Sequence, residues 1–363
     1  MLTLAAEVKT ASRHYPVQVG WECLDEVGRL VREHGFQGRV VMVSDQAVAS
    51  LYERAVRGSL EAVGFPVLHY EVPSGEASKT LESAGRIYDF LVEHRIERSD
   101  LVVALGGGMI GDLAGFVAVT FLRGLSWAVL PTSLLAMTDA SIGGKTGVNH
   151  PRAKNLIGAF HQPVLVLADV STLSTLPERE RTSGWAEVVK HGLTLDTALL
   201  DLLETHVEAL RALDPKITMK TVALSAAAKA AVVSQDERES GLRRVLNYGH
   251  TIGHALEAAT GYGRFLHGEA VAVGMMGAVR LSHRLGLVNE LLVARQESLL
   301  AAFGLPTHCS GVDREVVGMA MELDKKSREG EVRWVLLTAA GKTTIRPVPS
   351  AEVAAVLEEL VRP

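Results

Sequence analysis

In the first half of the chain, short runs of apolar and β-branched residues alternate with longer segments of helical pattern. The runs that we predict as strands are 40–44, 67–72, 101–105, 127–130 and 164–169. Helical segments are expected from Thr80 to Glu93 and from Leu113 to Leu122. Strands that are apolar throughout and separated by helices are typical of a parallel sheet covered on both faces. The pattern therefore predicts an α/β domain.

After Pro177 the pattern changes to long segments rich in Ala, Leu and Glu. These are expected as helices over roughly 178–191, 196–211, 215–235, 245–260, 268–284 and 289–303. Apolar residues at helical spacing with no strand pattern between them indicate a bundle of helices. We therefore expect an α/β domain with a parallel-rich sheet over residues 1–177 and an all-α domain over residues 178–363.

The strand expected at 101–105 runs directly into the loop Gly106-Gly-Gly-Met-Ile-Gly-Asp112. Its glycines match the G-x-G-x-x-G spacing between a strand and a helix, where backbone N–H groups and the helix dipole bind a pyrophosphate. The acid that usually follows about 20 residues later is missing, because the next strand ends in Pro131-Thr-Ser133. The loop predicts a nucleotide-binding domain that holds a dinucleotide in a non-standard arrangement. A glycine-rich turn without a ligand is the alternative.

Composition excludes several classes of protein. With 363 residues, 47% hydrophobic, the chain can bury a large core divided between two domains. A net charge of −5 and a pI near 6.2 give no electrostatic reason to expect nucleic acid. The sequence has no apolar run of membrane-spanning length and no signal-peptide pattern, and Cys23 and Cys309 are isolated. We expect a soluble cytoplasmic protein. The sequence leaves open whether the two cysteines form a disulfide.

Four polar residues in the helical half follow a helical spacing. Arg243, Asn247, His250 and His254 are separated by 4, 3 and 4 residues, so they would share one face of a continuous helix. Glycine weakens a helix, and Gly249 and Gly253 therefore predict that another element approaches closely. A third histidine, His267, opens the next helix.

Two imidazoles need a further ligand to make a catalytic metal site, and an acidic oxygen would leave one position open for substrate. The best acid is Glu187, which shares a helix face with Lys190 three residues later. For this pair alone a solvated surface ion pair is the alternative, and for any single histidine an ordinary core or surface role. Together these residues predict a divalent metal site.

The chain resembles the 3-dehydroquinate synthase family of sugar-phosphate cyclases over nearly its whole length. The resemblance rests on the segments 106–112, 131–149, 154–160, 187–190, 247–254 and 266–269. It implies an N-terminal nucleotide-binding α/β domain, a C-terminal helical domain with the active site between them, and a homodimer. One departure is Ser133, where the family commonly has threonine; the hydroxyl is retained.

The resemblance also implies residue roles. Zinc or cobalt would be held by Glu187, His250 and His267. NAD would be held by Asp45 on a ribose and by three further groups: Ser74, Gly75, Glu76, Ala77, Ser78 and Lys79; Gly107, Gly108, Met109, Ile110, Gly111 and Asp112; and Thr132, Ser133, Asp139, Lys145, Lys154, Thr172, Leu173, Ser174 and Thr175. The substrate would be bound by Lys145, Asn155, Lys190, Lys229, Arg243, Asn247 and His254, by Arg123 reaching across the dimer, and by one of Lys325 and Lys326.

The implied reaction is that of a phosphorus–oxygen lyase of the shikimate pathway. It converts 3-deoxy-D-arabino-heptulosonate 7-phosphate to 3-dehydroquinate and phosphate by transient oxidation with NAD, phosphate elimination, reduction and intramolecular aldol closure. One alternative is a related cyclase that takes sedoheptulose 7-phosphate or an amino analogue, which Lys229, Arg243 and His254 disfavour. Another is a metal-dependent polyol dehydrogenase, which needs fewer anion-binding groups. A scaffold without activity would leave many buried polar groups unexplained.

Overall fold

The computed structural model describes residues 2–327 and 332–362, apart from the side chains of 322–327. The chain forms two compact units. The first consists of Met1–Leu176 and Thr218–Arg238, and the second of Pro177–Ile217 and Glu239–Pro363. These units differ in one respect from the two domains predicted on either side of residue 177. Most of helix α8 (Pro215–Gln235) belongs to the first unit, although it follows Pro177 in the sequence.

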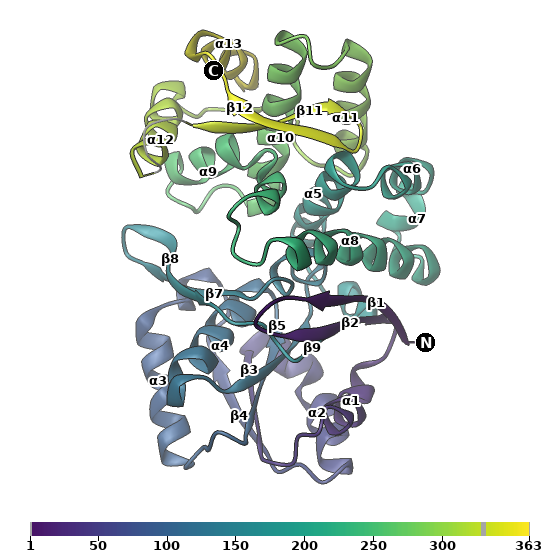
Figure 1. Cartoon of the computed structure of the whole chain (residues 1–363), viewed down its shortest axis with the longest axis vertical. Helices are drawn as coiled ribbons and strands as arrows, with labels where there is room; N and C mark the ends of the chain where they lie inside the picture. The colour runs from purple at the N-terminus through teal and green to yellow at the C-terminus, as the bar shows by residue number, and fades with distance from the viewer. Residues whose placement is uncertain (1, 328–331, 363) are drawn as a thin grey trace. The chain divides into compact units, whose positions relative to one another are not determined.

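A seven-stranded sheet, in the order β1-β2-β9-β6-β5-β3-β4, forms the centre of the first unit (Figure 1). Its strands are β1 (Leu2–Lys9), β2 (His14–Gly20), β3 (Val40–Asp45), β4 (Val67–Val72), β5 (Leu101–Gly106), β6 (Ser126–Pro131) and β9 (Leu165–Asp169). All neighbours are parallel except β1 and β2. The five predicted strands are therefore confirmed, and the β1–β2 hairpin at the edge is an addition.

Helices cover both faces of this sheet because its central strands are apolar on both sides. Val40 and Met42 of β3 pack in one apolar cluster with residues of α1 (Val27–Glu33) and α2 (Gln46–Ala62). Val41 and Val43 pack in a second cluster with residues of α3 (Leu81–Glu93) and α4 (Gly108–Thr120). Alternate residues of a strand point to opposite faces, so an all-apolar strand requires cover on each side.

The strand order reverses between β3 and β5. From β3 the chain passes through α2 to β4 at the edge of the sheet, and then through α3 back to β5 on the other side of β3. The carboxyl ends of these two neighbouring strands carry Asp45 and Gly106. Ligands of open α/β sheets bind outside the carboxyl ends of the strands at such a reversal. The topology alone thus favours a ligand site beside Asp45 and the glycine loop.

A second hairpin in the first unit was not expected from the sequence. It pairs β7 (Lys145–His150) with β8 (Ala153–Phe160) in antiparallel register. The two strands approach closely at glycines, because a Cβ on Gly158 would lie 2.1 Å from the carbonyl oxygen of Thr146. The hairpin carries the predicted site residues Lys145, Lys154 and Asn155.

The second unit is mainly helical, as expected. It contains α5 (Glu178–Thr194), α6 (Thr197–Thr205), α7 (Val207–Arg211), α9 (His250–Ala259), α10 (His267–Arg284), α11 (Glu290–Ala302), α12 (Arg314–Ser327) and α13 (Ser350–Leu360). Two small sheets were not expected: β11 (Arg333–Ala339) with β12 (Lys342–Pro347), and β10 (Cys309–Ser310) with β13 (Val361–Arg362). The helix predicted over 196–211 is divided at His206.

Helix α8 is long and apolar enough to cross a membrane by length and composition. Its apolar residues Ala226, Ala230 and Val233 belong to the core cluster that α3 and α4 also line. The same helix buries Lys229, which is ion-paired with Asp139. These contacts account for α8 as a core helix of the first unit.

Candidate functional site

The three predicted metal ligands come together within the second unit. Glu187 lies in α5, while His250 and His267 are the first residues of α9 and α10. Oε1 of Glu187 lies 3.5 Å from Nε2 of each histidine. Ligand atoms of all three residues lie within 4.8 Å of one another. Two imidazole nitrogens and a carboxylate oxygen therefore face a common point.

The helix predicted over 245–260 is interrupted, so the proposed single stripe is wrong. A 3₁₀ helix, η6 (Leu242–Asn247), ends before Tyr248, and Gly249 adopts the left-handed region at φ 82° before α9 begins. A Cβ on Gly249 would lie 2.8 Å from the carbonyl oxygen of Val271 in α10. The close approach predicted from the glycines is thus confirmed. It requires the break that starts a new helix at His250.

A second close contact places His267 beside Glu187. The backbone N–H of Gly268, at the start of α10, donates to the hydroxyl of Ser183, 3.0 Å away. A Cβ on Gly268 would lie 1.9 Å from the carbonyl oxygen of Ser183. Ser183 lies one turn before Glu187 on α5, so the same contact fixes the separation of the two ligands.

We expect Gly268→Ala to displace the start of α10, because the added methyl group has no space against α5. The variant should lose about 1–3 kcal/mol of stability, as other overpacked cores do, and its metal binding should fall. Thermal unfolding and metal analysis of the purified protein would measure both. Gly318→Ala in α12 is the matched control, since a Cβ there meets open space. Normal stability and metal content in Gly268→Ala would contradict the packing argument.

Glu187 and Lys190 form a buried ion pair, and the alternative of a solvated surface pair is excluded. Their side chains are 0% and 1% exposed. Burial alone would raise the pKa of Glu187, but the charges of Lys190 and the neighbouring histidines hold it well below its usual range. Burial and the charge of Lys190 also lower the pKa of His250. These two side chains are thus held in the deprotonated forms that bind metals.

The surroundings of the three side chains fit a divalent metal. Both carboxylate oxygens of Glu187 are buried; Oε2 pairs with Lys190, and Oε1 faces the two histidines. Nδ1 of His250 lies 3.2 Å from the carbonyl oxygen of Tyr248, which leaves Nε2 toward Glu187. Burial lowers the pKa of His267, but hydrogen bonds to Glu187 and Glu257 raise it to about 10. A metal would replace that proton. A carboxylate with two histidines is a common catalytic set for zinc, with a position left for substrate.

Among the predicted substrate residues, His254 lies near the metal cluster, and Arg243 and Asn247 lie in η6 of the same unit. The ring of His254 lies 5.2 Å from that of His250 and 6.0 Å from that of His267. Asn247 donates a hydrogen bond of 2.6 Å to Glu239. Arg243, also in η6, is buried. Arg243 and Asn247 thus precede the break and His254 follows it, so the three residues do not share one helix.

In the first unit, Lys79 is the centre of a second cluster of predicted residues. Its ammonium group lies 3.0 Å from both Asp112 and Glu76, and it donates to the side-chain oxygen of Asn155 at 2.6 Å. Burial raises the pKa of Asp112 to about 6, in spite of the opposing charge of Lys79. Lys229 and Asp139 form a separate buried pair, with the ammonium group 2.6 Å from Oδ1. The structure thus unites residues assigned separately to NAD and to substrate.

The glycine loop and Asp45 lie at the reversal of the strand order. Gly107 precedes α4, and the N–H of Thr132 donates to the carbonyl oxygen of Gly106 at 3.0 Å. Asp45 caps α2 by accepting from the N–H groups of Ala47 and Val48, and it also accepts from Ser74 Oγ at 2.8 Å. All three contacts use Oδ1. The positions of Asp45 and the glycine loop are therefore compatible with the predicted dinucleotide site, in which the acid comes from an earlier strand.

The remaining predicted residues occupy loops and edges. Residues 172–175 form part of the turn after β9, where the hydroxyl of Thr175 contacts that of Tyr52. Arg123 is exposed at φ 65° in the 3₁₀ turn Phe121–Arg123, and its reach across a dimer stays a prediction. Lys145 begins β7 and Lys154 lies in β8. The side chains of Lys325 and Lys326 lie outside the described residues.

Two residues were missed in the sequence. Glu257, in α9, lies 3.3 Å from Nδ1 of His267. Asn149 donates to Glu76 at 2.8 Å and accepts from the backbone N–H of Asn155 at 2.9 Å. Extending the polar spacing of α9 by three residues beyond His254 would have found Glu257. Asn149 lies inside a motif quoted for the family, but no spacing singled it out.

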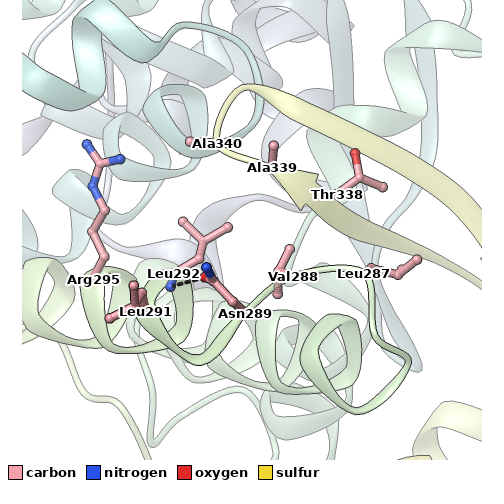
Figure 2. Close-up of a pocket in the computed structure, with 9 residues that line it drawn as sticks. All are labelled: Leu287, Val288, Asn289, Leu291, Leu292, Arg295, Thr338, Ala339 and Ala340. Atoms are coloured by element: carbon pink, nitrogen blue, oxygen red, sulfur yellow. Dashed lines mark hydrogen bonds between the residues drawn. The ribbon is translucent and has the colours of Figure 1, made fainter.

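One open pocket lies apart from these groups. It has a volume of about 470 Å³ and lies between the start of α11 and the turn of the β11–β12 hairpin (Figure 2). Its lining is largely apolar and includes none of the predicted site residues: Leu287, Val288, Asn289, Leu291, Leu292, Arg295, Thr338, Ala339 and Ala340. The residues predicted to bind metal, NAD and substrate therefore lie outside this pocket.

Comparison with known proteins agrees with the geometry. Sequence models of the N-terminal and C-terminal parts of 3-dehydroquinate synthase match residues 69–183 and 184–327. A 3-dehydroquinate synthase from Citrifermentans bemidjiense is 47% identical, over 90% of this chain and 91% of the relative. One from Desulforamulus reducens is 44% identical over 97% and 99%. This chain belongs to the 3-dehydroquinate synthase family.

Solved structures of other cyclases resemble this family member closely. A 2-deoxy-scyllo-inosose synthase complexed with carbaglucose-6-phosphate, NAD⁺ and Co²⁺ aligns with a TM-score of 0.88 at 28% identity, over 98% of this chain and 99% of the other. A 2-epi-5-epi-valiolone synthase from Streptomyces hygroscopicus subsp. jinggangensis, with NAD⁺ and Zn²⁺, gives the same values over 95% and 96%. A glycerol dehydrogenase from Schizosaccharomyces pombe, with a TM-score of 0.64 at 17% identity over 94% and 87%, shares the fold alone.

Proposed function

We propose that this chain is a 3-dehydroquinate synthase that converts 3-deoxy-D-arabino-heptulosonate 7-phosphate to 3-dehydroquinate and phosphate. It is then a phosphorus–oxygen lyase that uses NAD and zinc or cobalt. The observation that carries the proposal is the convergence of Glu187, His250 and His267 in a chain 47% identical to a relative of that name. We also propose that it acts in the cytoplasm as a homodimer.

The proposed metal residues are Glu187, His250 and His267, and the residues around them prepare the site. A metal bound there would supply Lewis-acid chemistry at a substrate hydroxyl, and bound NAD would supply reversible hydride transfer. Lys190 neutralises the buried Glu187 and places a cation beside the ligands. Arg243, Asn247 and His254 add donors in the same unit. Cations and donors of this kind suit a substrate with both a carboxylate and a phosphate.

The proposed NAD site is at the carboxyl ends of β3 and β5. Asp45 uses one carboxylate oxygen for its three internal contacts, so the other can accept a ribose hydroxyl. The start of α4 at Gly108 offers backbone N–H groups to the pyrophosphate. A Cβ on Gly106 would lie 2.8 Å from Cβ of Ile110, so the loop has no space for a side chain at that position. Lys79 and Asp112 complete the loop as an ion pair.

Turnover relative to NAD distinguishes a cyclase from a dehydrogenase. A cyclase oxidises and reduces one substrate within a single turnover, whereas a dehydrogenase releases one NADH for each substrate consumed. With substrate in large excess over NAD, we expect phosphate release far beyond the NAD present and no lasting NADH absorbance. Phosphate release capped at the amount of NAD, or NADH rising with substrate loss, would favour the polyol dehydrogenase. Faster turnover of sedoheptulose 7-phosphate would favour the related cyclase.

A further inference from the structure

Glu257 is a buried carboxylate that directly faces a proposed metal ligand. It lies on α9 and is 4% exposed. Its Oε2 lies 3.3 Å from Nδ1 of His267. His250, His254 and Glu257 are separated by four and three residues, so all three lie on one face of α9. A carboxylate is costly to bury without a partner, and its position against this ring therefore requires an explanation.

The geometry of His267 defines what Glu257 does to the ring. Nε2 of His267 lies 3.5 Å from Glu187 Oε1, on the opposite side of the ring from Glu257. A neutral imidazole has one N–H group and one lone pair, and the partner of one nitrogen determines which nitrogen keeps the hydrogen. A carboxylate at Nδ1 holds the hydrogen there, so the proton that a metal would replace is the one on Nε2, which faces Glu187. His250 has the same arrangement, with the carbonyl oxygen of Tyr248 at its Nδ1.

We propose that Glu257 is a positioning residue that orients His267 and strengthens metal binding through it. The inference rests on the metal assignment proposed above. Lys190 already neutralises Glu187, so Glu257 is a second carboxylate that can offset a divalent charge. A carboxylate partner also makes a ligand histidine more basic, and loss of such partners typically weakens metal binding 10- to 100-fold.

The test compares the metal affinity of the unaltered full-length protein with that of two variants at position 257. Each protein is first freed of metal. We expect Glu257→Ala to bind Zn²⁺ and Co²⁺ about 10- to 100-fold more weakly, measured by competition with a chromophoric chelator. Glu257→Gln should lose less affinity, because its amide oxygen can still accept from Nδ1. The visible spectrum of the bound Co²⁺ should change in Glu257→Ala, which a purely structural role would not produce.

A matched control is available in the same unit. Glu290 lies 3.4 Å from Nδ1 of His283, but both side chains are exposed. Glu290→Gln removes the same kind of carboxylate from a histidine outside the site, so its metal affinity should equal that of the unaltered protein. Thermal unfolding of the metal-free proteins separates misfolding from a specific effect. If Glu257→Ala does not fold, the metal affinity of Glu257→Gln alone tests the positioning role.

The outcomes separate this inference from the proposed function. Equal metal affinity in the unaltered protein and every folded Glu257 variant would overturn the positioning role. A second result would also overturn the positioning role. In it, Glu257→Ala loses metal affinity together with metal-free stability, while Glu257→Gln binds metal normally. Failure of the unaltered protein itself to bind a divalent ion would instead overturn the metal assignment.

Discussion

Replacing His267 with alanine is expected to abolish turnover and to lower the amount of bound metal. The change removes one of three converging ligands and leaves Glu187 and His250. A divalent ion held by two ligands is bound much more weakly, and the open position for substrate loses its geometry. Metal analysis of the purified variant, together with the phosphate-release assay, measures both effects.

NAD binding should largely survive in the same variant. The residues assigned to NAD all belong to the first unit, whereas the three proposed ligands belong to the second. Equilibrium titration with NAD would therefore show an affinity near that of the unaltered protein. His283→Ala, which removes an exposed histidine from the same helix, is the control for a change of histidine alone. Full metal content and normal activity in His267→Ala would remove this residue from the ligand set.

Replacing Lys79 with methionine is expected to weaken NAD binding at least tenfold and to destabilise the first unit. The change leaves Asp112 and Glu76 without the cation that both contact at 3.0 Å. Breaking one side of a buried ion pair typically costs about 3–5 kcal/mol, which corresponds to a fall of about 10 °C in the unfolding temperature. Lys9→Met, which removes an exposed ion pair with Glu7, should change stability by less than about 1 kcal/mol.

The effect of Lys79→Met should depend on pH in a known direction. Burial raises the pKa of Asp112 to about 6 even with Lys79 present, and without the lysine it rises further. An acid with a raised pKa in the folded state makes the protein less stable as pH rises above its unfolded pKa. The deficit of the variant should thus be largest at pH 8 and shrink as pH falls through 6. A deficit that is constant between pH 5 and pH 8 would show that Asp112 is not the group left uncompensated.

The parts of the fold that could be predicted are those whose burial is uniform. β3 and β5 are buried at every position, so their apolar runs were clear in the sequence. The β1–β2 hairpin lies at the edge of the sheet and is partly exposed, and its mixed pattern did not stand out. The β7–β8 hairpin depends on close approach at Gly158. A pattern of apolar residues does not report contacts of that kind.

For the candidate site, the sequence predicted which residues take part better than it predicted how they are arranged. The sequence indicated Glu187, His250 and His267, which come together, but it treated 245–260 as one helix. The break at Gly249 depends on its contact with α10, which is not local to the sequence. Residue spacing also did not show that the Glu187–Lys190 pair is buried, because its burial depends on neighbouring helices.

The return of α8 to the first unit has a consequence for how the chain folds during synthesis. Ala226, Ala230 and Val233 complete a core that otherwise consists of residues from the first half of the chain. That core cannot close until the ribosome has released residues up to about 238, well after the sheet itself is complete. A fragment that ends at residue 177 would expose this apolar surface. The nascent sheet should therefore need protection from aggregation until α8 emerges.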